Sequence, residues 1–342
     1  MKQINSIQRR TIIVSHYQNP LFLRTKKIPN YLFLKTKNNN CHDYFEIGFN
    51  LRNQNKIELI FLNKSCALAT TCLDLICQYL YLENINYGLN LIAAFKNFLK
   101  NVNFENEIAL INLNQKKLKD LVVFSKLYLQ KHRYSCLSIS LNLIESVLKN
   151  TLYKNKIRTQ FKEKLLTQNK FLNSLNSILI QKLVIKKIKE SNFKNIGIYL
   201  NNCFEVKTKK IIKYCLRKKI NLYVPKIISN KKLVFIKINQ NTTFKFNKFK
   251  IKEPIINNKT IFLKQNKLQV LILPCLFFIL NPLKRFGYGS GYFDSYLNNY
   301  CFQNNNLKLW LLAFKCQELK NKETIKKIVC YDQGKILNKI FF

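Results

Sequence analysis

The sequence is poor in the residues that interrupt secondary structure and in acidic groups. Its 342 residues include 7 Gly, 6 Pro, one Met and one Trp, so no Gly- or Pro-rich linker divides it. No apolar run reaches the roughly 20 residues that a membrane-spanning helix needs. The best candidate, residues 268–283, is interrupted by Pro274 and Pro282. Because the first residues also lack the apolar core of a secretory signal, we expect a cytoplasmic protein that does not enter a membrane.

The shortage of acidic residues leaves a large positive charge. There are 59 basic and 17 acidic residues, for a net charge of +42. Only eight of the basic residues are Arg, although Arg is the residue suited to bidentate recognition of phosphates and bases. Abundant Lys, Asn, Ile, Phe and Tyr are typical of AT-rich coding sequence. We therefore expect non-specific affinity for polyanions rather than a dedicated nucleic-acid function.

The two halves of the chain differ in charge and in pattern. Residues 1–150 carry 20 basic and 9 acidic groups, whereas residues 151–342 carry 39 and 8. The first half predicts a mostly helical N-terminal region: an irregular opening segment, then one strand and four helices, over 56–63, 67–82, 87–99, 116–130 and 137–148. It shows no catalytic constellation, and His42 and Asp43 fit a solvated loop. The region is either a partner-binding module or a fused second protein.

The second half, residues 151–342, alternates between helix and strand patterns. A basic amphipathic helix is predicted over 154–188, and further helices over 208–219 and from 293. Apolar strand patterns occupy five segments, 195–200, 221–227, 232–238, 268–274 and 308–314. Such alternation predicts an α/β fold, a three-layer sandwich around a largely parallel sheet.

The stretch RFGYGSGYFDSYL contains three of the seven Gly, at positions 287, 289 and 291. Gly tolerates positive φ and lets backbone approach a ligand closely. Successive N–H groups ahead of a helix bind anions, and Arg285 adds positive charge. Asp294 offers an oxygen ligand suited to Mg²⁺. The loop indicates a nucleotide phosphate site, with a Gly-rich tight turn as the alternative. Its spacing fits neither a Walker A loop nor a dinucleotide-binding fingerprint.

The stretch resembles the R-L-G-x-G-x-G-Y-Y-D-x-x-L signature of the 5-formyltetrahydrofolate cyclo-ligase family. Further segments resemble that family's motifs in the family's order: KNKIR (154–158), IGIYLNNCFEVKT (196–208), INLYVPKI (220–227), FKIKEP (249–254), LILPCLFF (271–278) and LLAFKCQ (311–317). The resemblance covers about residues 154–341, and residues 1–150 match no family that we recognise.

The resemblance implies an enzyme, an ATP-dependent carbon–nitrogen ligase. It would convert 5-formyltetrahydrofolate into 5,10-methenyltetrahydrofolate with Mg²⁺ as cofactor, releasing ADP and phosphate. The formyl oxygen would attack the γ-phosphoryl group, and N10 would then displace phosphate from the phosphorylated formyl intermediate. ATP and 5-formyltetrahydrofolate would be small-molecule partners of a monomer.

The resemblance also implies site residues. It places ATP on Lys154, Arg158, Arg285, Phe286, Gly287, Tyr288, Gly289, Ser290, Gly291, Tyr292 and Phe293. It places folate on Leu200, Glu205, Tyr288 and Tyr292, chemistry on Arg285 and Tyr292, and Mg²⁺ on Asp294 and Asp332.

The departures from the family pattern include three substitutions. Phe293 replaces the second Tyr of Tyr-Tyr-Asp, Ser295 replaces an Arg that often follows it, and Cys275 replaces a Gly. The C-terminal D-x-x-x-D also lacks its second Asp. The alternative function is therefore a catalytically eroded binding protein of the same fold, which would bind RNA or another polyanion through its Lys-rich surface.

Overall fold

The computed structural model describes residues 5–28, 31–37, 44–51, 56–100, 119–124, 131–229, 232–247, 250–258, 260–263, 267–301, 306–329 and 339–342. The chain divides into two compact units, Met1–Tyr153 and Lys154–Phe342. Helix α5 (Lys131–Leu166) runs through the division. Each unit has its own secondary structure and core, so each is described by itself.

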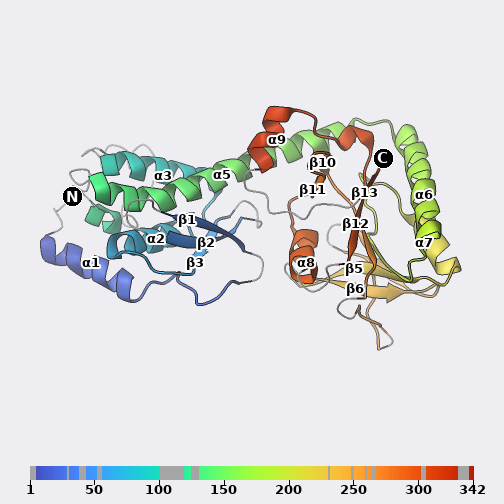
Figure 1. Cartoon of the computed structure of the whole chain (residues 1–342), viewed down its shortest axis with the longest axis horizontal. Helices are drawn as coiled ribbons and strands as arrows, with labels where there is room; N and C mark the ends of the chain where they lie inside the picture. The colour runs from blue at the N-terminus through green and yellow to red at the C-terminus, as the bar shows by residue number, and fades with distance from the viewer. Residues whose placement is uncertain are drawn as a thin grey trace. The chain divides into compact units, whose positions relative to one another are not determined.

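The first unit combines helices with an antiparallel sheet. Its elements besides α5 are α1 (Ser6–Gln18), β1 (Leu32–Lys37), β2 (Tyr44–Asn50), β3 (Glu58–Phe61), α2 (Ala67–Leu80), α3 (Ile85–Lys100) and the 3₁₀ helix η1 (Lys119–Phe124). The strands form one sheet in the order β1-β2-β3 (Figure 1). Buried Asp74 of α2 accepts hydrogen bonds from His16 Nδ1 at 2.7 Å and from the backbone N–H of Phe22 at 2.9 Å. This carboxylate ties α1 and the segment after it to α2.

The expectation of an irregular opening segment is wrong. Asn5 caps α1 through a reciprocal pair of hydrogen bonds with Gln8. Strands β1 and β2 pair over six residues on either side of the polar segment 38–43. The predicted helix over 116–130 appears as 3₁₀ helix over its described residues, 119–124. His42 and Asp43 lie outside the described residues.

The second unit is an α/β fold, as predicted, with a mixed sheet. Its helices after α5 are α6 (Lys170–Ser191), α7 (Lys209–Arg217), α8 (Tyr292–Cys301), the 3₁₀ helix η3 (Lys315–Gln317) and α9 (Lys322–Val329). The six-stranded sheet has the order β13 (Lys339–Phe341), β12 (Lys308–Leu312), β9 (Val270–Leu273), β4 (Asn195–Ile198), β5 (Asn221–Ser229) and β6 (Lys232–Ile238). Adjacent strands are parallel except β5 and β6.

Two small hairpins accompany this sheet. One pairs β7 (Phe244–Phe246) with β8 (Lys252–Pro254), and the other pairs β10 (Phe277–Ile279) with β11 (Lys284–Phe286). The predicted helix over 154–188 is in fact the end of α5 followed by α6. The break has a local cause, because the Asn169 side chain accepts hydrogen bonds from the N–H groups of Phe171 and Leu172 and caps α6.

The core of the second unit occupies both faces of its sheet. Because side chains alternate along a strand, Val270 and Ile272 join one apolar cluster with residues of α6 and α7. Leu271 and Leu273 join another that includes Leu297 of α8. Helices α6 and α7 accordingly lie on one side of the sheet and α8 on the other (Figure 1). This packing fixes the carboxyl ends of β4 and β9 beside each other.

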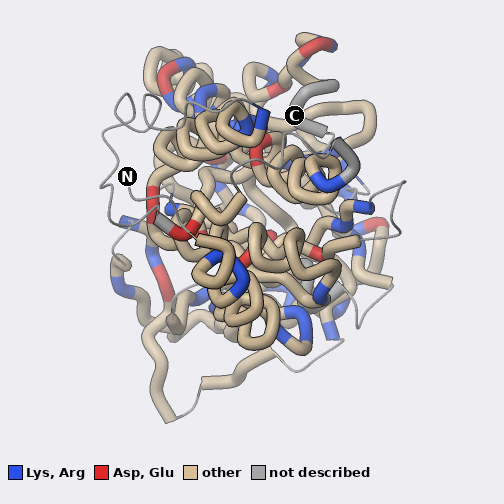
Figure 2. The backbone as a smooth tube through the Cα atoms, turned by 90° about the vertical axis from the view of Figure 1, so that its left-hand side faces the viewer, with Lys and Arg blue, Asp and Glu red and all other residues tan. Residues whose placement is uncertain are grey.

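The abundant Lys and Arg residues are distributed along the chain, and the described helices are not strongly apolar. Figure 2 shows Lys and Arg spread over many segments of the tube rather than concentrated in one. Among the helices that the structure describes, none combines the length and the apolar character required to cross a membrane.

Candidate active site

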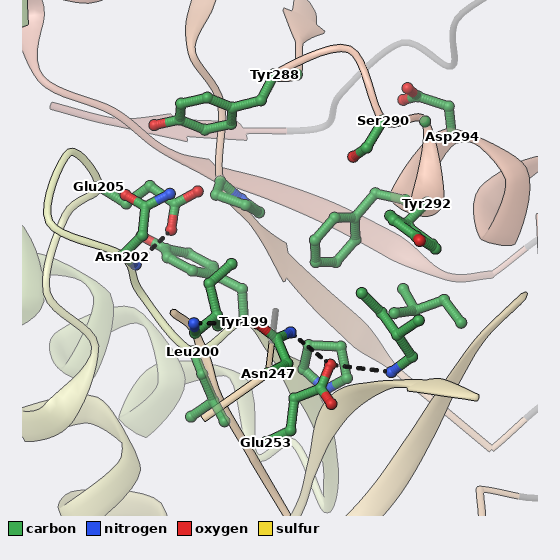
Figure 3. Close-up of a pocket in the computed structure, with 18 of the residues that line it drawn as sticks. Tyr199, Leu200, Asn202, Glu205, Asn247, Glu253, Tyr288, Ser290, Tyr292 and Asp294 are labelled. Carbon is green, nitrogen blue, oxygen red and sulfur yellow. Dashed lines mark hydrogen bonds between the residues drawn. The ribbon is translucent and has the colours of Figure 1, made fainter. Parts of the chain in front are cut away.

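A cavity of about 390 Å³ opens in the second unit at the carboxyl ends of the central strands. In sheets with parallel strands, this edge is where ligands bind. The cavity is lined by residues that follow β4, by β5, by the loop and hairpins around β8 and β11, and by the start of α8 (Figure 3). Its lining includes a basic, Gly-rich stretch and a buried carboxyl group.

The Gly-rich loop connects β11 to α8. Gly289 and Gly291 have φ of +107° and +71°, which side chains with a Cβ rarely adopt. Gly287 makes room for Arg285, since a Cβ at position 287 would lie 2.9 Å from a guanidinium nitrogen. The loop leads directly into the N-terminus of α8 at Tyr292. Its conformation and the helix start provide the backbone N–H groups that an anion needs.

Arg285 is fixed beside this loop. Its Nε donates to the carbonyl of Pro274 at 3.0 Å, and a terminal nitrogen donates to Asp294 Oδ1 at 2.8 Å. Its guanidinium carbon lies 5.6 Å from the centroid of the Phe293 ring. The side chain is only 7% exposed, so its positive charge is preorganised rather than mobile.

Helix α5 adds basic side chains one turn apart. Arg158 donates from Nε to the carbonyl of Gly287 at 3.1 Å and from a terminal nitrogen to Asn155 at 2.7 Å. Lys154 precedes Arg158 by one turn, and Lys162, which follows it by one turn, lines the cavity. Positions i, i+4 and i+8 lie on one face of a helix. This face therefore places positive charge along the Gly-rich loop.

Glu205 also lines the cavity, seven residues after β4. Its Oε2 accepts the backbone N–H of Asn202 at 2.9 Å, and the residue is 8% exposed. Burial raises the pKa of Glu205 to about 7, while the Asn202 hydrogen bond and the charge of Arg285 act in the opposite direction. The carboxyl group therefore changes its charge near neutral pH.

The predicted residues do not all lie on the cavity. Its lining includes Leu200, Glu205, Arg285, Gly287, Tyr288, Ser290, Gly291, Tyr292, Phe293 and Asp294. The Phe286 side chain instead stacks on Phe277, with centroids 4.5 Å apart, so only its backbone could meet a phosphate. Leu200 both lines the cavity and packs against the core. Asp332 lies outside the described residues.

The sequence patterns did not indicate that Glu253 and its neighbours line the cavity. Glu253 Oε1 accepts the Ile227 N–H at 3.1 Å and the Asn247 side-chain amide at 2.8 Å. Its other carboxylate oxygen lies 3.6 Å from Lys226 Nζ. These contacts hold the β7–β8 hairpin against β5 (Figure 3). The signal was present in the sequence as FKIKEP, but that motif alone does not reveal that Glu253 faces a cavity.

The residues present fit a magnesium ion that accompanies a nucleotide. Mg²⁺ usually keeps several waters and takes one or two protein carboxylates together with phosphate oxygens. Asp294 supplies such a carboxylate, 45% exposed, directly after the Gly-rich loop. Within the described part of the chain, no three His, Cys, Asp or Glu side chains gather as a metal-binding group. The donor set therefore suits a nucleotide-bound cation better than a cation held by the protein alone.

The solved structures that the chain resembles are distant, and they include the following two. A 5,10-methenyltetrahydrofolate synthetase from Mycoplasma pneumoniae has a TM-score of 0.41 and 19% identity, covering 55% of this chain and 97% of that one. A putative iron–sulfur cluster assembly scaffold protein for the SUF system, from Fervidobacterium islandicum, has a TM-score of 0.32 and 15% identity, covering 39% of this chain and 91% of that one. Likenesses this distant do not bear on activity.

Sequence similarity is more informative. The sequence model of the 5-formyltetrahydrofolate cyclo-ligase family matches residues 150–322. A 5-formyltetrahydrofolate cyclo-ligase of Haemophilus influenzae is 31% identical over 139 residues, which are 40% of this chain and 72% of the relative. A probable 5-formyltetrahydrofolate cyclo-ligase of Schizosaccharomyces pombe is 27% identical over 152 residues, 44% and 74% of the two chains. Through its second unit, the chain belongs to the 5-formyltetrahydrofolate cyclo-ligase family.

Proposed function

We propose that the chain converts 5-formyltetrahydrofolate and ATP into 5,10-methenyltetrahydrofolate, ADP and phosphate. The observation that carries this proposal is that one cavity combines fixed basic groups and the Gly-rich loop with a buried carboxyl group. Arg158 donates to Gly287 of the Gly-rich loop, and Lys162 and Arg285 line the cavity. Glu205 is buried and lines the same cavity, where it accepts the N–H of Asn202. A polyphosphate fits the basic groups, and the N–H groups of a pterin ring fit the carboxyl group.

The arrangement accounts for the chemistry through positioning and charge. Phosphoryl transfer depends mainly on in-line geometry and on neutralising the phosphate oxygens. The loop N–H groups, Lys154, Arg158 and Arg285 would hold the triphosphate, and the formyl oxygen would attack the γ-phosphoryl group. N10 would then attack the phosphorylated formyl carbon and phosphate would leave with the C–O bonding electrons, closing the ring. Tyr292, at the start of α8, would contact both ligands.

The remaining assignments complete the proposal. Mg²⁺, held by Asp294 and by Asp332, would neutralise phosphate charge. Glu205 would accept hydrogen bonds from the pterin, and Leu200 would pack on the folate. The sheet with helices on both faces would act as a rigid three-layer support, in a cytoplasmic monomer.

The test is an absorbance assay for 5,10-methenyltetrahydrofolate with the full-length protein. We expect the absorbance to rise only when 5-formyltetrahydrofolate, ATP and Mg²⁺ are all present. An unchanged absorbance with folded protein would contradict the proposed enzymatic activity. If that protein then bound RNA saturably, the alternative of an eroded, polyanion-binding relative would be supported.

A further inference from the structure

Helix α6 carries an exposed row of large apolar side chains opposite the face that packs on the sheet. Its inner face, which includes Ile180, Val184 and Ile188, is buried in the core of the second unit. The exposed side chains, between 42% and 70% accessible to solvent, are Phe171, Leu172, Leu175, Leu179 and Leu183. From Leu172 onward they recur every three or four residues, so they form one stripe along the helix. We call these five side chains the outer stripe.

An apolar stripe of this length indicates a binding surface. A surface helix usually buries one apolar stripe and presents polar side chains to water, whereas a helix that is apolar all round is normally buried. Contiguous apolar side chains left exposed on a folded domain mark contacts with proteins or with membranes. The outer stripe therefore requires a partner, and the charges around it indicate which kind.

Positive charge continues the stripe toward the end of α6. Lys182 and Lys186 are exposed, and each follows a Leu of the outer stripe by three residues, on the same side of the helix. Helix α6 contains no acidic residue before Glu190 in its last turn, and the Glu190 carboxylate pairs with Lys187 Nζ at 3.1 Å. The apolar side chains are thus flanked by net positive charge.

Helix α7 widens this basic border. It lies beside α6 on the same side of the sheet (Figure 1), where Gln181 accepts the Lys210 N–H at 2.8 Å. Lys189 Nζ of α6 lies 5.8 Å from the centroid of the Tyr214 ring of α7. The exposed basic side chains of α7 are Lys209, Lys210, Lys213 and Arg217, and its sequence holds no acidic residue. The outer surface of this helical layer is therefore apolar along α6 and basic beside it.

Charge selects the partner. A second copy of the chain also carries a net charge of +42, so pairing two copies through this surface would bring like charges together. RNA would complement the basic side chains but would leave the outer stripe in water. A bilayer that contains anionic lipids complements both features, because its head groups attract Lys and Arg and its acyl chains accept Phe and Leu.

We propose that the outer surface of α6 and α7 binds an anionic lipid bilayer, with the outer stripe inserted at the boundary between head groups and acyl chains. The expectation of a protein that does not enter a membrane concerned spanning helices, whereas a helix bound in this way lies on the bilayer. The described lining of the cavity includes no residue of α6 or α7. The inference therefore goes beyond the proposed function and does not depend on it.

The experiment measures how much full-length protein sediments with vesicles of phosphatidylcholine and phosphatidylglycerol in equal parts. The test variant combines Leu175→Gln with Leu179→Gln, since Gln is a good helix former. The matched control combines Ile256→Gln with Ile261→Gln, because these side chains lie outside both helices and are 43% and 57% exposed, against 42% and 57% for the two Leu. We expect the control to bind like wild type and the test variant at least about tenfold more weakly. Circular dichroism verifies the fold of each variant.

Each contrary outcome overturns the proposal. Folded wild-type protein that stayed in the supernatant would exclude the bilayer as the partner. Equal binding by wild type and the α6 variant would assign the attraction to the overall charge of the chain rather than to the outer stripe. Analytical ultracentrifugation addresses the other occupant, because a wild-type dimer that the α6 substitutions convert into a monomer would place a second copy on the stripe.

Discussion

At the scale of single residues, burial decides what Glu205 can do. Its carboxyl group is desolvated, so its pKa rises from 4.5 to about 7. The folded protein therefore holds this proton more tightly than the unfolded chain does. Proton binding by Glu205 therefore adds to the free energy of unfolding at low pH. This contribution is lost as the pH rises from about 4.5 through about 7.

The pH dependence of stability tests this environment. Glu205→Gln keeps an acceptor for the Asn202 N–H but cannot ionise. We expect the variant to gain stability relative to wild type between pH 5 and pH 8, by up to about 3 kcal/mol. Urea unfolding at several pH values measures the difference. Exposed Glu190 of α6 is the control, and Glu190→Gln should show no trend over this range. Parallel profiles for Glu205→Gln and wild type would show that Glu205 is not desolvated.

Asp294 has two separable roles at the same scale. Its carboxylate accepts from Arg285, and it is the carboxylate proposed to hold Mg²⁺. Asp294→Asn keeps an oxygen for Arg285 but removes the negative charge, whereas Asp294→Ala removes both. We expect both variants to fold and to lose turnover at least about 100-fold, as measured by the methenyltetrahydrofolate assay across a Mg²⁺ titration. Substantial activity of the Asn variant would mean that Asp294 only positions Arg285.

At the scale of elements, α5 matters because it meets the Gly-rich loop. Arg158 is 129 positions before Gly287 in the sequence, yet it donates to the Gly287 carbonyl. The helix therefore holds the loop and also adds charge to the phosphate side. A change in Arg158 should affect the nucleotide more than the folate.

Arg158→Ala tests that arrangement, with Lys156→Ala as a control of like charge on the same helix. Lys156 is exposed and does not line the cavity. We expect Arg158→Ala to raise the KM for ATP about tenfold and the KM for folate less, and Lys156→Ala to change neither. Steady-state kinetics with each substrate varied in turn gives both values. A larger effect on folate would contradict the phosphate role of α5.

At the scale of the whole molecule, the proposed chemistry belongs to the second unit. Every described residue that lines the cavity, from Lys162 to Asp294, lies after the division at residue 153/154. A fragment of residues 150–342 should therefore keep kcat/KM within about threefold of the full chain, provided that circular dichroism shows it folded. A folded but inactive fragment would show that the first unit contributes to the reaction.

The α/β character of the second unit and the basic, Gly-rich part of the cavity lining were predictable from the amino-acid sequence alone. Both depend on local patterns. Apolar strands alternate with amphipathic helices, and Arg285, the three Gly and Asp294 stand within ten consecutive residues. The apolar pattern that identifies a strand was less clear in the first unit. Strand β1 includes exposed Lys35 and Lys37, and β2 contains Glu46 and Gly48. These strands are recognisable through their pairing, which is not a local property.

Which further residues line the cavity depends on tertiary packing, not on local sequence. Lys162, Glu253 and Tyr288 are separated by tens of residues in the chain, and the packing of α5, β5 and the β7–β8 hairpin brings them to one cavity. The raised pKa of Glu205 depends on exclusion of water. Water is excluded by many contacts between residues that are far apart in the sequence. No short sequence motif can therefore predict it.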